Sequence, residues 1–178
     1  MQSRKQHLIE TAVRLFNQYG YHATGIDLIL AESKVSKATL YKYFRSKDEL
    51  ILAALALRHE QVLTAIKGKI SDADQREELT ELAVFDALDE WFNSADFYGC
   101  SFIHATAEYA DPINPIHIFS AQHKQAIVEL IGEQLSLEDS HKADQIGLLV
   151  EGSIVMAHTR GMKNAAILAK EMAKGLLV

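Results

Sequence analysis

The sequence predicts an all-α protein of about nine helices. Apolar residues recur at helical spacing along most of its 178 residues, and no segment shows the strict alternation of a half-buried strand. The 9 glycines and 2 prolines are too few for a fold rich in tight turns. With 48% hydrophobic and 24% charged residues, the chain can bury a core without a disulfide or a metal.

Three short helices are expected near the start of the chain, over residues 3–19, 24–33 and 37–44. The apolar side chains of the first share one face, namely Leu8, Ala12, Leu15, Phe16 and Tyr19. Gly20 is expected to end this helix. Thr24 and Ser36 are the expected N-caps of the second and third helices, because their hydroxyls can accept from free helix N–H groups.

A long fourth helix is expected to begin at the capping-box sequence Ser46-Lys47-Asp48-Glu49 and to end near Gly68. A polar break is expected over residues 71–76. Five further helices are expected, over residues 77–97, 101–109, 117–135, 138–160 and 163–176. Glycine or proline lies in most of the breaks between them.

Charge is divided unevenly along the chain. Residues 1–50 carry eight Lys or Arg and five acids, a net charge of +3, whereas residues 51–178 carry ten and nineteen, a net charge of −9. A basic head on an acidic body suggests that only the head meets a polyanion such as DNA. The alternative is a solvated basic face that binds nothing.

We expect a cytoplasmic protein. Its single cysteine, Cys100, permits no intramolecular disulfide and suits a reducing compartment. No apolar run is long enough to span a membrane, and the first residues do not have the pattern of a signal peptide.

The second and third expected helices have the arrangement of a helix-turn-helix, in which the second helix of the pair enters the major groove of DNA. Leu40 and Phe44 can share a buried face. The residues left pointing outward are Lys37, Ala38, Tyr41 and Lys42. A surface helix with a solvated basic face is the alternative, and periodicity alone fits both.

Residues 4–55 resemble the DNA-binding domain of tetracycline-repressor-type (TetR) regulators. The matching residues occur in order as Leu15-Phe16, Tyr19-Gly20-Tyr21, Thr24-Gly25-Ile26-Asp27, Ile29-Leu30-Ala31-Glu32, Val35 to Phe44 and Ser46 to Leu50. Parts of the remaining chain resemble one TetR subgroup, namely Gly99 to Phe102, Glu108, His123-Lys124 and Leu149 to Val155. The resemblance implies a helix-turn-helix DNA-binding domain over residues 1–46 and a helical ligand-binding and dimerisation domain over residues 47–178.

The resemblance, together with the position of the residues on the third helix, gives the expected DNA-contacting residues, which are Thr24, Ser36, Lys37, Ala38, Thr39, Tyr41, Lys42, Tyr43 and Lys47. Thr24 and Lys47 are expected to bind phosphates at helix starts, where free N–H groups favour an anion. Lys37 could donate to a guanine edge. The family often has Ala-Gly where this chain has Ser33-Lys34, and a lysine with positive φ in that turn would cost on the order of 1 kcal/mol.

The last two long helices match the family's dimer interface. The expected contact residues are Leu149, Ser153, Ile154, Ala157, Ala165, Ala169 and Met172. Apolar residues spread around the first of these helices, so that one face can serve the protomer and another a second copy. The alternative is that both are ordinary core helices.

The middle helices enclose a small-molecule cavity in the family. Candidates for its wall are Leu63, Trp91, Phe92, Tyr98, Phe102, His104, Tyr109, His117 and Phe119. A pocket needs mostly apolar walls and a few polar groups. Because aromatic residues at helical spacing are usually core, at least half of this set is expected to be core.

Other patterns allow two interpretations each. Cys100 could be a redox sensor, but a buried inert thiol is expected because no basic residue lies near it in the sequence. His104 and Glu108 share a helix face and could bind a metal, but separately satisfied side chains are expected. We expect no metal, no cofactor and no enzymatic activity. Glu108 and the His123-Lys124 pair are expected to form hydrogen bonds or ion pairs between neighbouring helices.

The sequence thus predicts a homodimeric transcriptional repressor that binds a palindromic DNA operator and is released by an unknown small-molecule effector. The alternative class is a helical small-molecule-binding or enzymatic protein whose basic N-terminus is incidental. A dimeric DNA-binding protein without a ligand is a third possibility.

Overall fold

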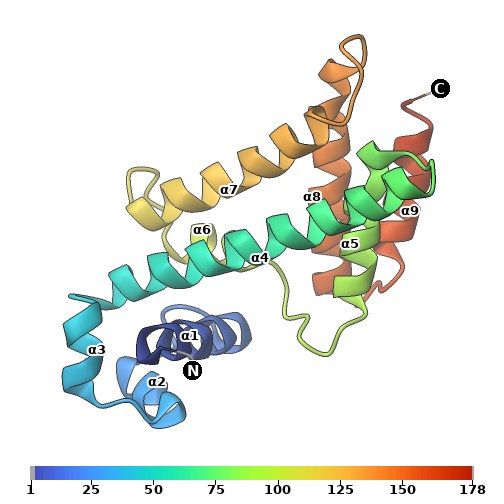
Figure 1. The fold of residues 1–178 in the computed structure, drawn as a ribbon. Helices are drawn as coiled ribbons and strands as arrows, with labels where there is room; N and C mark the ends of the chain where they lie inside the picture. The colour runs from blue at the N-terminus through green and yellow to red at the C-terminus, as the bar shows by residue number, and fades with distance from the viewer. Residues whose placement is uncertain (1–2, 178) are drawn as a thin grey trace. The chain divides into compact units, whose positions relative to one another are not determined.

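The computed structural model describes residues 3–177, and over that stretch the backbone is helical with no strand (Figure 1). The nine α-helices of this stretch are α1 (Arg4–Tyr19), α2 (Ile26–Ser33), α3 (Lys37–Tyr43), α4 (Lys47–Gln75), α5 (Ala83–Phe92), α6 (Ser101–Glu108), α7 (Pro115–Gly132), α8 (Ala143–Arg160) and α9 (Ala165–Lys174). Short 3-10 helices precede α5 and α8, namely η1 (Thr80–Leu82) and η2 (Ser140–Lys142). The predicted all-α class and helix number are confirmed for the described residues.

The described residues form two compact units. The head unit contains the residues up to Gln61 together with Cys100–His123, and the body unit contains Val62–Gly99 together with the residues from Lys124 onward. Thus α1, α2, α3 and α6 belong to the head unit, α5, α8 and α9 belong to the body unit, and α4 and α7 contribute to both. The predicted assignment of DNA binding to residues 1–46 and of ligand binding and dimerisation to residues 47–178 stays a prediction.

The helices α1, α2 and α3 pack together in the head unit. Its buried apolar side chains include Leu8, Leu15, Phe16, Ile29, Leu40 and Leu50. Between α2 and α3, Lys34 has φ 56° and ψ 24°, the left-handed conformation expected for this turn. Ser36 caps α3 as predicted, because its Oγ accepts from the N–H of Thr39 at 3.2 Å.

The prediction that Thr24 caps the second helix is wrong. Gly25 is the N-cap, and α2 begins at Ile26. Thr24 is fully buried, and its hydroxyl donates to the carbonyl oxygens of Leu15 at 3.2 Å and Gly20 at 2.6 Å. The turn after α1 brings Thr24 to two carbonyls at the end of that helix, so its hydroxyl serves α1 instead of α2.

The predicted end of the fourth helix near Gly68 is also wrong, because α4 continues to Gln75 through the expected polar break. Polar side chains do not stop a helix, and one solvent-exposed glycine costs only about 1 kcal/mol. The helix ends where Glu77 takes a positive φ of 56° and the N–H groups of Arg76 and Glu78 both donate to the carbonyl of Ala73. At its start, Ser46 Oγ accepts from the N–H of Glu49 at 3.2 Å.

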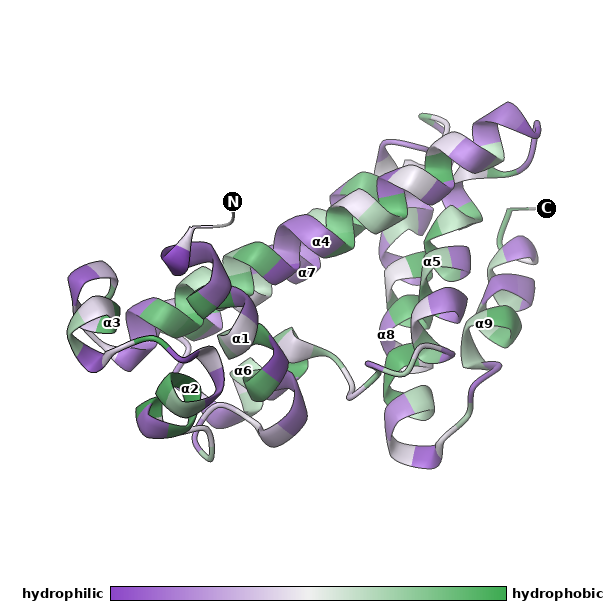
Figure 2. Ribbon diagram, turned by 60° about the horizontal axis from the view of Figure 1, so that its bottom comes forward, coloured by the Kyte–Doolittle hydropathy of each residue, from purple (hydrophilic) through white to green (hydrophobic). Residues whose placement is uncertain are grey.

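In the body unit, α5, α8 and α9 pack against one another, and hydrophobic residues occur on all three (Figure 2). The buried side chains include Phe85, Leu88, Phe92, Ile146, Val150, Ala166 and Ala173. Lys170 Nζ lies 2.6 Å from Asp86 Oδ1 and joins α9 to α5. Lys124 Nζ lies 2.8 Å from Glu151 Oε1 and joins α7 to α8.

The fifth helix is shorter than predicted and ends at Phe92 instead of residue 97. The Trp91 carbonyl, which residue 95 would use in a further turn, accepts instead from the N–H of Ser94 at 3.1 Å. Asn93 Nδ2 donates to the carbonyl of Asp89 at 2.8 Å, and Ser94 Oγ donates to that of Trp91 at 2.8 Å. The remaining predicted helices are present, with ends shifted by a few residues.

Within the described residues, we find no helix that combines the length and the apolar character required to cross a membrane.

Candidate nucleic-acid interface

The third helix presents a polar and aromatic face to solvent. Lys37, Ala38, Tyr41 and Lys42 are exposed, as the sequence predicts, and Thr39 and Tyr43 are half-buried. On the opposite side, Leu40 and Phe44 are buried and hold the helix to the head unit. The geometry is that of a helix whose outer face is free to enter a groove. The contacts of these side chains with DNA stay a prediction.

Exposed basic groups flank this face. Lys34 precedes α3, and Arg45 follows it. The Lys5 Nζ lies 5.7 Å from the centroid of the Phe44 ring. Because these cations belong to the segment with the net positive charge, they can contribute phosphate attraction without reading sequence.

Lys47 begins α4 and is half-buried. Its Nζ donates to the carbonyl oxygen of His22 at 3.4 Å. Burial lowers the pKa of Lys47, while the carboxylates of Glu108 and Asp48 oppose that shift. Because Lys47 is the first residue of α4, it brings a positive charge to a helix N-terminus. The free N–H groups of the helix and the charge of the side chain both favour a phosphate there.

Two of the other expected contact residues already have partners. Ser36 Oγ is 2.9 Å from Thr39 Oγ1, in addition to capping α3. The Thr24 side chain is buried, and its hydroxyl is paired with backbone carbonyls. Thr24 could give its hydroxyl to a phosphate only after that pairing breaks, and its DNA contact stays a prediction.

An apolar groove of about 260 Å³ lies on α8 and α9. Five of the expected dimer residues line it, namely Leu149, Ser153, Ala165, Ala169 and Met172. Ile154 and Ala157 are not among the lining residues and are buried in the body unit. The lining also includes Leu148, Gly152, Met156, Met162 and Leu168, which lie outside the set of expected contact residues. Leu148, Gly152 and Met156 recur at helical spacing along α8.

The walls of this groove are unusually exposed for apolar side chains. Leu148 is 73% exposed, Met172 is 63% exposed and Leu168 is 44% exposed. Small residues, among them Gly152 and Ala169, lie between them on the same surface. A groove with small residues and projecting apolar walls suits close packing against another helix surface.

The expected effector residues are divided between the units. The head unit holds Phe102, His104, Tyr109, His117 and Phe119, and the body unit holds Leu63, Trp91, Phe92 and Tyr98. Phe92 and Phe102 are buried core residues. The role of the set in ligand binding stays a prediction.

Several of these aromatic and histidine side chains have defined partners. The Phe102 ring is stacked on His123 with centroids 3.5 Å apart. His117 Nδ1 is 2.9 Å from the carbonyl oxygen of Tyr109. The Trp91 and Phe97 rings meet edge to face at 4.9 Å.

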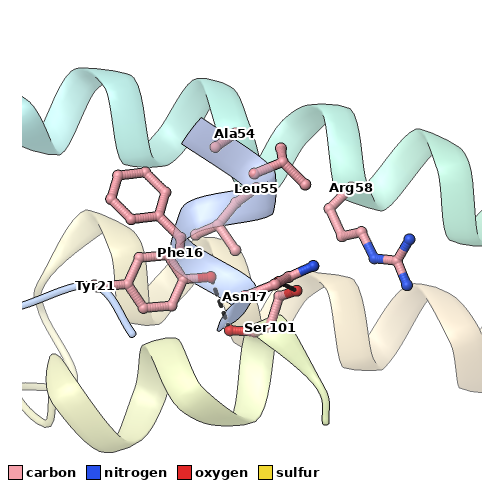
Figure 3. Close-up of a pocket in the computed structure, with 8 residues that line it drawn as sticks. Phe16, Asn17, Tyr21, Ala54, Leu55, Arg58 and Ser101 are labelled. Atoms are coloured by element: carbon pink, nitrogen blue, oxygen red, sulfur yellow. Dashed lines mark hydrogen bonds between the residues drawn. The ribbon is translucent and has the colours of Figure 1, made fainter. Parts of the chain in front are cut away.

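A small cavity in the head unit lies between α1, α4 and α6 (Figure 3). Its lining includes Phe16, Asn17, Tyr21, Arg58 and Ser101, and its volume of about 10 Å³ has room for about one water molecule. The Tyr21 phenol donates to the carbonyl of Ser101 at 2.9 Å, and Ser101 Oγ donates to Asn17 Oδ1. This cavity is therefore a packing feature and too small for an organic effector.

Glu108 bonds to backbone instead of to another helix's side chain. Its carboxylate accepts from the N–H groups of Tyr21 and His22, in the turn between α1 and α2. Among the described residues, no group of three or more His, Cys, Asp or Glu side chains is placed to hold a metal. Cys100 is buried.

Residues 8–54, which include α2 and α3, match the family model described as bacterial regulatory proteins, tetR family. The HTH-type transcriptional regulator YuxN of Bacillus subtilis is 37% identical over 87 residues, which cover 46% of this chain and 30% of that protein. The HTH-type transcriptional regulator YxaF of the same species is 25% identical over 177 residues, which cover 94% of this chain and 91% of that protein.

A solved structure gives the same result for the whole fold. SCO4454, a TetR-family transcriptional regulator from Streptomyces coelicolor, superposes with a TM-score of 0.88 at 28% identity, and the match covers 98% of this chain and 89% of that one. The similarity therefore includes both the head unit and the body unit.

Proposed function

We propose that this chain, which belongs to the TetR family of DNA-binding transcriptional regulators, is a homodimeric repressor that leaves a palindromic operator when a small molecule binds. The exposed face of α3 carries this proposal, because it offers side chains to a groove while Leu40 and Phe44 anchor the helix. Bacterial DNA lies in the cytoplasm, which is the compartment we propose.

In this proposal, affinity comes from phosphates and specificity from base edges. Lys47 and Lys42 neutralise phosphates. Lys37, at the start of α3, donates to O6 and N7 of a guanine. The Tyr41 ring, 47% exposed, is available to contact a thymine methyl.

The proposed dimer forms through the groove on α8 and α9. A second copy would cover Leu148, Leu168 and Met172, which are otherwise exposed to water. A two-fold dimer places two copies of α3 in successive major-groove faces, with half-sites about 34–36 Å apart or slightly more. Inverted repetition of the operator follows from that symmetry.

We propose that the effector is a largely apolar, flat molecule, because the expected wall residues are mainly aromatic. Trp91 and Phe97 form an edge-to-face pair, and the Lys163 Nζ lies 5.0 Å from the Phe97 ring centroid. The effector releases DNA by binding more tightly to a conformation that fits the operator poorly.

The test is selection from random duplex DNA at near-physiological salt, followed by sequencing of the retained duplexes. The expected result is an inverted repeat with half-sites about one helical turn apart or slightly more. The enriched duplex, labelled with a fluorophore, then serves to screen flat aromatic compounds for release. Uniform loss of binding with rising salt, without an enriched sequence, would contradict the proposal. If a repeat is enriched but no compound releases it, the proposed operator binding would stand and the proposed flat aromatic effector would be contradicted.

A further inference from the structure

The Glu108 carboxylate, in the last turn of α6, binds two adjacent backbone N–H groups. Oε1 accepts from Tyr21 at 2.8 Å, and Oε2 accepts from His22 at 2.6 Å. His22 Nδ1 lies 3.2 Å from the same Oε2. Hydrogen bonds to an ionised acceptor are among the strong ones, and two from one carboxylate also define an orientation. Glu108 thus clasps the turn that leads into the helix-turn-helix.

The clasped turn has further anchors. The Tyr21 phenol donates to the carbonyl of Ser101 at 2.9 Å, so the first and last residues of α6 both bind Tyr21. Thr24 Oγ1 donates to the carbonyl of Gly20 at 2.6 Å. Gly20 has φ 86°, and a β-carbon there would lie 2.9 Å from Glu108 Oε1. The glycine therefore serves both the turn and the close approach of the carboxylate.

His22 links this clasp to Lys47. It gives its N–H to Glu108 and accepts the Lys47 ammonium on its carbonyl oxygen at 3.4 Å. The path from α6 to the start of α4 therefore passes through one residue. Lys47 lies where the family's phosphate contact is expected, at the N-terminus of α4.

We infer that Glu108 is a positioning residue for operator binding, which holds the turn between α1 and α2 and, through His22, the phosphate-binding position of Lys47. This inference rests on the proposed contact of Lys47 with a phosphate. The inference predicts a change in DNA affinity whose direction is opposite to the one that the charge alone would cause. Loss of a negative charge beside Lys47 should by electrostatics alone tighten binding to DNA. Loss of the clasp should instead weaken it.

The test compares Glu108→Gln with Glu32→Gln. Both remove one carboxylate charge, and Glu32 pairs with Arg14 at 2.8 Å at an exposed site on α2. The probes are the inverted-repeat duplex enriched by the wild-type chain and a scrambled duplex of equal composition. For the repeat, Glu108→Gln should raise Kd about tenfold, and Glu32→Gln should leave it unchanged or lower it.

A double-mutant cycle with Lys47→Ala separates positioning from general damage. If Glu108 acts through Lys47, Glu108→Gln should change Kd by at most about twofold in the Lys47→Ala background. Helix content from circular dichroism gives the folded fraction of each variant. Glu108→Asp, which retains the charge one methylene short of its partners, is the second variant and should raise Kd by an intermediate factor.

Two results would overturn the inference: wild-type or tighter binding by Glu108→Gln, or an equal loss with and without Lys47. Failure of the wild-type chain to enrich any repeat is a separate result, because it would overturn the proposed function itself.

Discussion

The imidazole of His158 occupies the space beside Gly99 in which any other residue would place its β-carbon. A β-carbon built at Gly99 would lie 2.7 Å from His158 Nδ1, closer than nonbonded atoms tolerate. Gly99 also has φ 92° and is buried. A side chain at this position would therefore strain the backbone and would also require the exposed His158 side chain to move.

Gly99→Ala should lower the free energy of unfolding by about 2 kcal/mol or more, because the alanine adopts a strained φ and displaces His158. Urea denaturation followed by circular dichroism measures the change. Gly68→Ala is the matched control, since Gly68 lies within α4 with open space around it, and it should gain about 0.5–1 kcal/mol. Equal stability of Gly99→Ala and the wild type would contradict the described contact.

Lys34→Gly should stabilise the protein by about 1 kcal/mol, because glycine adopts the left-handed conformation of this turn without strain. The same change removes an exposed positive charge and should reduce the salt dependence of DNA binding slightly. Thermal unfolding and binding at several salt concentrations give the two readouts. Lys34→Ala, which removes the charge but retains a β-carbon, should not be stabilised.

Lys47→Ala should weaken binding to specific and nonspecific duplexes by similar factors and lower the salt slope by about one unit. The physical reason is the loss of one phosphate contact. Fluorescence anisotropy at four salt concentrations measures the slope. Lys67→Ala, which removes an exposed lysine of α4 in the body unit, should leave it unchanged. A changed preferred sequence with an unchanged slope would show that Lys47 reads bases instead.

Leu148→Glu should convert the dimer to monomer, because each charge would be buried in the proposed interface. Since Leu148 is 73% exposed in the protomer, helix content should not change. Sedimentation velocity measures the oligomeric state. Leu137→Glu is the control, because Leu137 is 96% exposed and is not part of the groove lining. A dimer that persists in Leu148→Glu and dissociates in Leu137→Glu would place the interface elsewhere.

The free energy of unfolding should fall as pH rises above about 10, where an unfolded tyrosine ionises. Burial raises the pKa of Tyr21 well above its ordinary value, and the pKa of Tyr109 is raised to about 12, with burial as the largest cause. The folded state therefore retains protons that the unfolded state releases, so their stabilising contribution is complete below pH 10 and is lost above it.

Urea unfolding between pH 8 and 11 measures this effect. Tyr21→Phe should be about 1 kcal/mol less stable at pH 8, because the Ser101 carbonyl loses its donor. It should lose less additional stability above pH 10 than the wild type does. The same decline in both proteins would exclude Tyr21 as a cause.

Local features of the helix-turn-helix could be predicted from sequence because they depend on residues close in the chain. The Ser36 cap, the left-handed Lys34 and the buried Leu40 and Phe44 all follow from spacing and backbone preferences. Thr24 shows the limit of such reasoning. Two helix ends compete for its hydroxyl, and the three-dimensional turn decides between them.

The partners of Glu108 could not be predicted in this way. They are backbone N–H groups 86 and 87 positions earlier in the chain, and a backbone group leaves no signature in the sequence. The exposure of Leu148 could not be predicted for a different reason. Helical periodicity finds apolar stripes, but it does not separate the stripe that faces the protomer core from the stripe that stays in water.

The exposed walls of the α8–α9 groove also bear on how the proposed regulation would respond to the amount of protein. Leu148, Leu168 and Met172 are exposed in the protomer. If a second copy covers them, as we propose, the DNA-binding species forms by a bimolecular step. At concentrations below the dimer dissociation constant, the amount of dimer rises with the square of the chain concentration. Twofold dilution by cell division would then reduce the dimer fourfold, and the regulated genes would be released well before the protein itself is lost.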